Sequence, residues 1–460
     1  MPEPTQLDDL LACPRCDKTP LSRVESHFRC QACAVDFPQV GNLPWLFAEP
    51  GAALGEWRNR LHFALQQLAH AAQRIRAELK SGELSEPTRQ RLELLVSANE
   101  EHRKLLQELL QPIDVQSLDA AYTSHLALRT RLPSDQGLNT YYANVHRDWN
   151  WGEEENAASL EQLRLALAAS GGDMPGDTLL LGAGAGRLAY DFHQQLEPAR
   201  TVAVDFNPLL MFIARDVTRG AQLSLYEFPL APRSLSETAV LRTLAAPAVV
   251  RDGFHLLLGD VLRAPFAAQS FDTVVTPWLI DIVSEDFAVF ARRINRLLKP
   301  GGRWLNFGSL AFDHPDRVRC YSAEETLLLV EQSGFTTPEV LQAAIPYMCS
   351  PASRHGRTET VFTFAARKQQ EVKPPARHIA LPDWIVTGKE PVPLLPSFRT
   401  QAMSTQVYSF IMSLIDGRRT IDDMAKLLEQ QKLMSRQEAL PAIRQFLTRM
   451  YDDSQRQSGF

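Results

Sequence analysis

Short apolar runs alternate with helical stretches between Asp177 and Phe307, and this alternation limits the fold more than any other feature of the sequence. Five runs have the length and composition of buried strands: residues 178–181, 201–204, 255–258, 273–275 and 303–307. Each run leads into a turn or a helix, as in a parallel sheet with crossover connections. The sequence therefore predicts an α/β domain with a doubly wound, Rossmann-like sheet over about residues 139–368.

A glycine-rich loop follows the first of these runs. Gly182, Gly184 and Gly186 lie between the strand end and a helical stretch that begins near Arg187. Glycine allows a tight turn and a close approach of the backbone to a ligand, so the loop indicates a nucleotide site. Dinucleotide-dependent dehydrogenases use a similar loop, so the loop alone does not identify the ligand.

Acidic residues end the next two predicted strands. Asp205 follows the loop by about 20 residues, where a carboxylate can accept hydrogen bonds from both ribose hydroxyls of a nucleoside. Asp260, followed by Val261, ends the third strand, where an adenine amino group would lie. Taken singly, Asp205 is equally compatible with a helix cap and Asp260 with a turn. Their order and spacing after the glycine loop favour a bound nucleoside.

Two later features, together with the glycine loop and the strand-end acids, form a pattern that resembles a known family. The fourth predicted strand ends at Thr276, and a Lys-Pro-Gly-Gly turn at residues 299–302 precedes the fifth. The series resembles the successive motifs of class I S-adenosylmethionine-dependent methyltransferases, and the turn disfavours the alternative, a nicotinamide-dependent dehydrogenase. The resemblance implies that S-adenosylmethionine is the cofactor and that its binding residues are Gly182, Gly184, Gly186, Arg187, Asp205, Asp260, Val261 and Thr276.

Four segments further resemble the carnosine N-methyltransferase family, which methylates an imidazole nitrogen of histidine-containing dipeptides. They are residues 147–153, 208–211, 276–281 and 304–310, and the resemblance extends from about Tyr141 to Arg367. It implies that the acceptor is carnosine, another histidine-containing small molecule or a peptide. The insertion at residues 223–251 departs from the family pattern and leaves the choice among these acceptors open.

The resemblance also suggests residues that act on the acceptor. A carboxylate just past the fourth strand can hold one imidazole N–H, which fixes the tautomer and leaves the other nitrogen free to attack. We therefore expect Asp281 to orient the acceptor; the alternative is an ordinary helix N-cap. Asn306, Tyr347 and His314 are expected to face the same pocket, although His314 is equally compatible with a simple loop.

Four of the six cysteines form a metal-binding pattern near the N-terminus. Cys13 and Cys16 make one C-x2-C pair, and Cys30 and Cys33 make the second pair after a 13-residue spacer. This spacing predicts four thiolates around one structural Zn²⁺, with a redox pair as the alternative. Together with the segment after Phe37, it resembles the zinc-ribbon proteins that activate tRNA and protein methyltransferases.

Apolar periodicity and proline content divide the rest of the chain into regions. After the zinc ribbon (residues 1–50), apolar residues at three-to-four-residue steps predict a helical hairpin within residues 51–138. A proline-rich linker is expected at residues 369–400. The final region, residues 401–460, is helical, and its segment from Ile415 to Leu428 resembles PqqD-like, winged-helix domains that bind a leader peptide. A plain helical bundle is the alternative there.

Charge and hydropathy narrow the partners and the compartment. The net charge is −6 and both signs are intermixed, which argues against nucleic acid as a partner without excluding it. There is no long apolar segment for a membrane and no signal segment at the N-terminus, so we expect a cytoplasmic protein with a small-molecule or peptide substrate. The alternatives are a tRNA or protein methyltransferase with a built-in zinc-ribbon activator, and a non-catalytic peptide-binding scaffold.

Overall fold

The computed structural model describes residues 7–115 and 141–458, except 173, 315, 380, 383 and 386–388. The chain divides into two compact units, residues 1–382 and 383–460. The end of the expected helical region, residues 116–138, lies outside the described residues. No described helix is both long and apolar enough to cross a lipid bilayer.

A mixed sheet forms the centre of the first unit. Its strands follow the order β13-β14-β12-β11-β6-β7-β10-β5-β4. Five of them contain the five predicted runs and are parallel to one another: β6 (Asp177–Leu181), β7 (Arg200–Asp205), β10 (Phe254–Gly259), β11 (Phe271–Pro277) and β12 (Leu298–Gly308). At one end, β14 (Arg357–Arg367) and β13 (Glu339–Tyr347) are antiparallel.

Helices cover both faces of this sheet, which explains the continuous apolar runs of its strands. In β6, Leu180 packs into one hydrophobic core, whereas Leu179 and Leu181 pack into the other. The covering helices are α5 (Glu153–Ala169), α6 (Arg187–Gln195), α7 (Pro208–Thr218), α8 (Phe287–Leu297) and α9 (Ala323–Gln332). The expected doubly wound α/β fold is confirmed.

The four-cysteine module joins the central sheet. Its three short strands, β1 (Ser22–Val24), β2 (His27–Cys30) and β3 (Val35–Phe37), form an antiparallel sheet of their own. The chain then forms β4 (Gln39–Val40) and β5 (Leu43–Leu46), and β5 lies parallel to β10, with Trp45 opposite Leu258. The expected boundary near residue 50 is therefore a change from strand to helix, and the segments on both sides of it share one hydrophobic core.

Two hairpins pack beside this sheet. The helical hairpin consists of α1 (Pro50–Ser81) and α2 (Glu86–Leu109), and Trp57 and Leu61 of α1 are buried in the main core. The insertion contains β8 (Leu223–Glu227) and β9 (Val240–Leu244), which pair as a two-stranded sheet. Before α5 and β6 in the chain, α4 (Tyr142–His146) continues directly into the short helix η3 (Arg147–Trp151).

The second unit is helical in its described part. It contains α11 (Pro396–Ser413), α12 (Ile421–Gln430) and α13 (Arg436–Ser458). Thr420 and Asp423 form the expected capping box at the start of α12. Ile411, Leu428 and Ile443 belong to a separate small core. No strand is described in this unit, and its likeness to winged-helix domains stays a prediction.

Candidate cofactor and acceptor site

A cavity of about 200 Å³ lies at the carboxyl ends of the parallel strands. Open α/β sheets bind ligands at this edge, because the loops after neighbouring strands diverge there. Six residues expected from the sequence line the cavity: Gly182, Gly184, Asp205, Asp260, Val261 and Tyr347. The lining also includes Trp278 after β11 and Arg147 of η3.

The three loop glycines have different tasks. All three have positive φ angles, 73° at Gly182, 57° at Gly184 and 85° at Gly186, where a side chain would be strained. A Cβ at Gly184 would meet nothing within 4 Å, so this residue opens onto the cavity. A Cβ at Gly186 would lie 2.9 Å from Cβ of Ala214 in α7, so Gly186 allows the packing of two helices and does not line the cavity.

Asp205 ties the end of β7 to the glycine loop. Its carboxylate accepts hydrogen bonds from the backbone N–H groups of Gly184 and Asn207, both at 2.8 Å. Burial raises the pKa of Asp205 to about 6, although these two N–H groups lower it. A carboxylate held in this way at the cavity wall can still accept hydrogen bonds from hydroxyls of a ligand.

Asp260 serves both the local turn and the cavity. Its side chain accepts a hydrogen bond from Leu262 N at 2.8 Å, so it caps the short helix η5 (Val261–Arg263). The turn residue considered in the sequence analysis is therefore also part of the cavity wall. Burial raises the pKa of Asp260, whereas the hydrogen bond from Leu262 N and the nearby guanidinium groups of Arg263 and Arg293 lower it.

Three of the expected residues stand behind the cavity wall. Arg187 donates to Asp191 (2.8 Å), to the backbone oxygen of Asp148 (2.7 Å) and to Glu153 (2.8 Å). The hydroxyl of Thr276 donates to Asn306 Oδ1 at 3.0 Å inside the sheet. Arg187, Thr276 and Asn306 are buried and do not line the cavity. Their observed contacts support the strands and η3 rather than a ligand.

Asp281 also lies outside the cavity lining, just beyond it on the loop after β11. Its Oδ2 accepts hydrogen bonds from the hydroxyl of Ser309 at 2.6 Å and from Ala311 N at 2.8 Å. It is not a helix cap, because α8 begins later and Asp286 caps it. Within the described part of the chain, no hydrogen bond to Oδ1 of Asp281 is found. His314 does not line the cavity either; it lies in a loop, where its Nδ1 accepts a hydrogen bond from Asp316 N.

The structure adds aromatic and cationic residues that the sequence analysis assigned no role. Trp278 has a φ of 49°, which is unusual for a bulky side chain, and its ring lies 5.0 Å from that of Tyr347. Arg147 donates to Asp148 (2.7 Å) and to Glu155 (2.8 Å), and Glu155 accepts a bond from Met348 N. Arg147 was quoted within a family segment, but only the fold brings it next to Tyr347.

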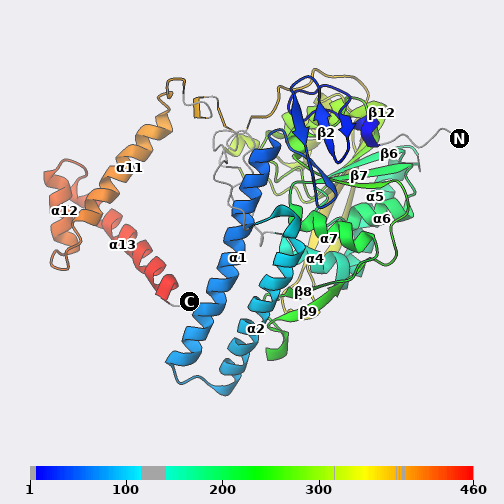
Figure 1. Cartoon of the computed structure of the whole chain (residues 1–460). Helices are drawn as coiled ribbons and strands as arrows, with labels where there is room; N and C mark the ends of the chain where they lie inside the picture. The colour runs from blue at the N-terminus through cyan, green and yellow to red at the C-terminus, as the bar shows by residue number, and fades with distance from the viewer. Residues whose placement is uncertain are drawn as a thin grey trace. The chain divides into compact units, whose positions relative to one another are not determined.

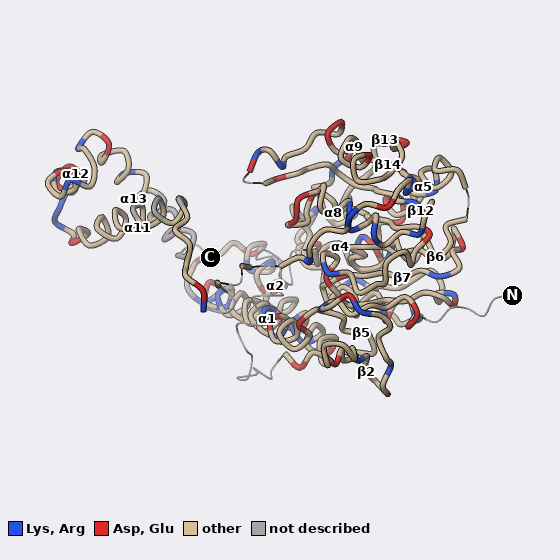
Figure 2. The backbone as a smooth tube through the Cα atoms, turned by 90° about the horizontal axis from the view of Figure 1, so that it is seen from above, with Lys and Arg blue, Asp and Glu red and all other residues tan. Residues whose placement is uncertain are grey.

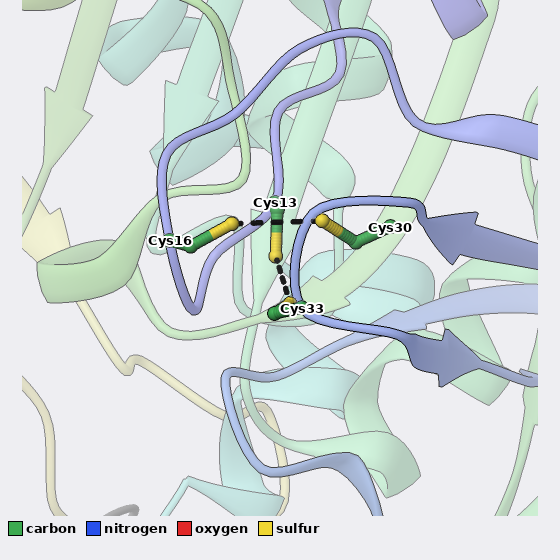
Figure 3. A group of neighbouring side chains, drawn as sticks. All are labelled: Cys13, Cys16, Cys30 and Cys33. Carbon is green, nitrogen blue, oxygen red and sulfur yellow. Dashed lines mark hydrogen bonds between the residues drawn. The ribbon is translucent and has the colours of Figure 1, made fainter.

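The four cysteines meet in space as their spacing predicted. Figure 3 shows Cys13, Cys16, Cys30 and Cys33 pointing toward one another from two loops. Their sulfur atoms all lie within 4.8 Å of one another, with 3.6 Å between Cys13 and Cys33 and 3.5 Å between Cys16 and Cys30. A tetrahedral metal with bonds of about 2.3 Å requires sulfur atoms about 3.8 Å apart, so the cluster can hold one ion. All four thiols are free.

Basic and acidic residues are intermixed over the described part of the chain. In Figure 2, blue and red positions occur side by side along the backbone of both units. Many of them form pairs, such as Arg293 with Glu285 and Arg242 with Glu227. This distribution agrees with the intermixed charges of the sequence.

Comparisons with known proteins were made for sequence and for structure. A family model described as carnosine N-methyltransferase matches residues 135–370, just over half of the chain. A search of curated proteins found no match.

Solved structures resemble the chain at low identity. N-methyltransferase NodS of Bradyrhizobium japonicum, with S-adenosyl-L-homocysteine bound, is 15% identical, and the match covers 50% of this chain and 98% of NodS with a TM-score of 0.32. A methyltransferase of Thermotoga maritima described as a possible histamine N-methyltransferase is 17% identical, with coverage of 49% and 93% and a TM-score of 0.30. Phosphoethanolamine N-methyltransferase 2 of Haemonchus contortus is 16% identical, with coverage of 58% and 60% and a TM-score of 0.31.

Proposed function

This chain belongs to the carnosine N-methyltransferase family, and from that membership we propose that it methylates an imidazole nitrogen of a histidine-containing small molecule or peptide. The chain is an S-adenosylmethionine-dependent methyltransferase. The observation that carries the proposal is the single cavity in which the glycine loop, two strand-end carboxylates and an aromatic pair meet.

One side of this cavity offers the groups that would hold the cofactor. S-adenosylmethionine supplies an electrophilic methyl group when it is bound. Gly184 offers an open backbone surface, and Asp205 and Asp260 offer carboxylates at the ends of two adjacent strands. We propose that Asp205 accepts hydrogen bonds from the ribose and that Asp260 lies beside the adenine. Arg187 and Thr276 would support this wall from behind.

The acceptor would lie beside Trp278 and Tyr347. A neutral imidazole nitrogen must be held in line with the methyl group, and the ring loses its N–H proton once it is methylated. Oδ2 of Asp281 is held by Ser309 and Ala311, which leaves Oδ1 for the N–H of an acceptor that extends beyond the cavity. Asp281 would fix the tautomer so that the opposite nitrogen attacks. Asn306 would act only through the sheet, behind Thr276.

Mass spectrometry of methyl transfer tests this proposal. The purified chain is incubated with S-adenosylmethionine and with carnosine, histidine peptides or bulk tRNA. We expect a methylated imidazole, and Asp281→Ala should lower its rate by about 100-fold. Asp313→Ala, which removes an exposed carboxylate from a neighbouring loop, should leave the rate unchanged. Methylated tRNA with unmodified imidazoles would contradict the proposal.

We further propose Zn²⁺ as the ion of the four-cysteine cluster. Four thiolates at tetrahedral spacing leave no open coordination position, which suits a structural site and not a catalytic one. The resemblance to zinc-ribbon activators supports the same assignment. Metal analysis of the purified chain should find one zinc per chain.

A further inference from the structure

A segment just beyond the family match reaches the cavity. Residues 371–378, which we call the strap, follow the last strand of the sheet and contain no helix or strand. The family model ends at residue 370, and the sequence analysis treated this region only as a linker. His378, near the end of the strap, lines the same cavity as Asp260.

The strap is fastened along its length. Glu371 pairs with Lys368 at 2.5 Å and accepts a hydrogen bond from Gln269. Further on, the backbone oxygen of Ala376 accepts a hydrogen bond from Arg293 at 2.8 Å. Arg293 also holds Glu285 through two contacts, of 2.5 and 2.7 Å. The strap is therefore a fixed part of the first unit.

His378 has a defined environment. Its Nδ1 lies 3.4 Å from a carboxylate oxygen of Glu285, which Arg293 fixes in turn, and its side chain is 20% exposed. Val261 and Leu262 share the cavity lining with His378. These neighbours present an imidazole ring and two apolar side chains at the place where Asp260 ends its strand. A flat heteroaromatic ring such as adenine suits such a wall, because bases stack on histidine and bury apolar surface against aliphatic side chains.

The four-cysteine module fastens the same end of the strap. Arg263 donates to the backbone oxygens of Pro14 (2.9 Å), Arg15 (3.0 Å) and His378 (2.8 Å). Arg377 donates to Asp17 at 2.6 Å and to the backbone oxygen of Cys16 at 2.9 Å. The segment from Pro14 to Asp17 therefore contacts Arg377 directly and is linked to the backbone of His378 through Arg263.

We propose that His378 is a further cofactor-binding residue, which contacts the adenine beside Asp260 and is positioned by the four-cysteine module through Arg263 and Arg377. The proposal rests on the cofactor site proposed above. In this proposal the N-terminal module positions a cofactor-binding residue, and its metal does not need to contact the substrate. The proposal also gives the adenine a contact that lies outside the family-matched region.

Calorimetric titration of the full chain with S-adenosylmethionine and with adenosine tests this proposal. His378→Ala should weaken both ligands by about 10-fold, because the lost contact lies on their common adenine. Arg377→Ala should weaken both by about 3-fold through a less constrained strap. The matched control is Arg23→Ala, which removes an ion pair with Asp8 from the same module without touching the strap. It should bind as the unchanged chain does.

The outcomes separate the two proposals. Thermal unfolding of each variant shows whether it is folded. Unchanged affinity of a folded His378→Ala variant would overturn the adenine contact and leave the proposed cofactor site standing. Loss of affinity in His378→Ala but not in Arg377→Ala would overturn the role of the module. Absence of S-adenosylmethionine binding by the unchanged chain would overturn the proposed site itself.

Discussion

If Asp205 accepts hydrogen bonds from the cofactor as proposed, cofactor binding should depend on pH. Burial holds its pKa at about 6, well above the usual value for an aspartate. Protonation removes an acceptor for the ribose hydroxyls, so the affinity for S-adenosylmethionine should fall as the pH is lowered through 6. The fall should approach 10-fold per pH unit below that value. Calorimetry between pH 5 and pH 8 measures it.

The variant Asp205→Asn provides the control for this effect. It has no titrating group at this position, so its affinity should be lower at pH 8 and nearly constant with pH. An unchanged pH profile in Asp205→Asn would assign the titration to another group.

Gly184 and Gly186 should respond differently to the same substitution. Gly184→Ala places a methyl group in the open space of the cavity and should mainly weaken S-adenosylmethionine. Gly186→Ala places it 2.9 Å from Ala214 at a φ of 85°, so the free energy of unfolding should drop by roughly 2 kcal/mol. Urea unfolding and calorimetry on both variants separate the effects. Equal losses of stability would contradict these roles.

At the scale of elements, the four-cysteine loops stabilise the edge of the sheet. They precede β5, which pairs with β10, and Asp260 directly follows β10. Removal of the metal with a strong chelator should lower the melting temperature by roughly 5 °C or more and weaken S-adenosylmethionine. The control is the double variant Cys320→Ser and Cys349→Ser, which removes the two cysteines outside the cluster. We expect the chelator to lower its stability as much as that of the unchanged chain. A double variant that the chelator does not affect would mean that Cys320 and Cys349 hold the metal.

The packing of α2 against α4 and β8 depends on neutral histidines. Burial lowers the pKa of His102 in α2 and of His146 in α4 to about 4. The His102 ring packs 5.0 Å from Tyr142 and 5.5 Å from Phe228. Between pH 6.5 and 4 the unfolded chain binds protons that the folded protein excludes, so stability should fall as the pH falls through this range.

Urea unfolding at pH 7 and pH 5 measures this effect. Each such histidine lowers the free energy of unfolding by at most about 1.4 kcal/mol per pH unit as the pH falls. His102→Leu should reduce the pH dependence only in part, because His146 and the buried His193, with a pKa of about 4, remain. The exposed-face variant His62→Gln is the control. A slope that His102→Leu leaves unaltered would mean that His102 binds protons equally well in the folded and the unfolded chain.

At the scale of the whole molecule, the two units have separate cores. The core residues of the first unit all precede residue 367, and those of the second unit follow residue 406. A chain that ends at Pro382 should therefore retain its melting transition and its affinity for S-adenosylmethionine. If the second unit binds a peptide as its resemblance suggests, the shortened chain should methylate small acceptors normally and peptides more slowly. If the shortened chain methylates peptides as fast as the full chain does, the second unit has no role in peptide methylation.

The sequence by itself determined the five parallel strands of the sheet and the cysteine cluster, but not β4, β5, β13 and β14, which extend the sheet at its two ends. The apolar runs predict strands because both faces of a parallel strand are buried, so that most of its positions are apolar. The glycine loop and the strand-end acids were recognisable because a turn with positive φ and a strand terminus are local features. The paired cysteines were recognisable for the same reason, since two short loops supply all four ligands.

Only the tertiary structure decided which of the expected residues share a cavity. Arg187, Thr276 and Asn306 follow the family motifs, yet their hydrogen bonds draw them behind the wall. Trp278 and Tyr347 come from strands far apart in sequence and meet through the order of the sheet. His378 reaches the cavity through contacts with residues more than 100 positions away, as with Arg263. No local pattern encodes such contacts, because they depend on where distant segments come to lie.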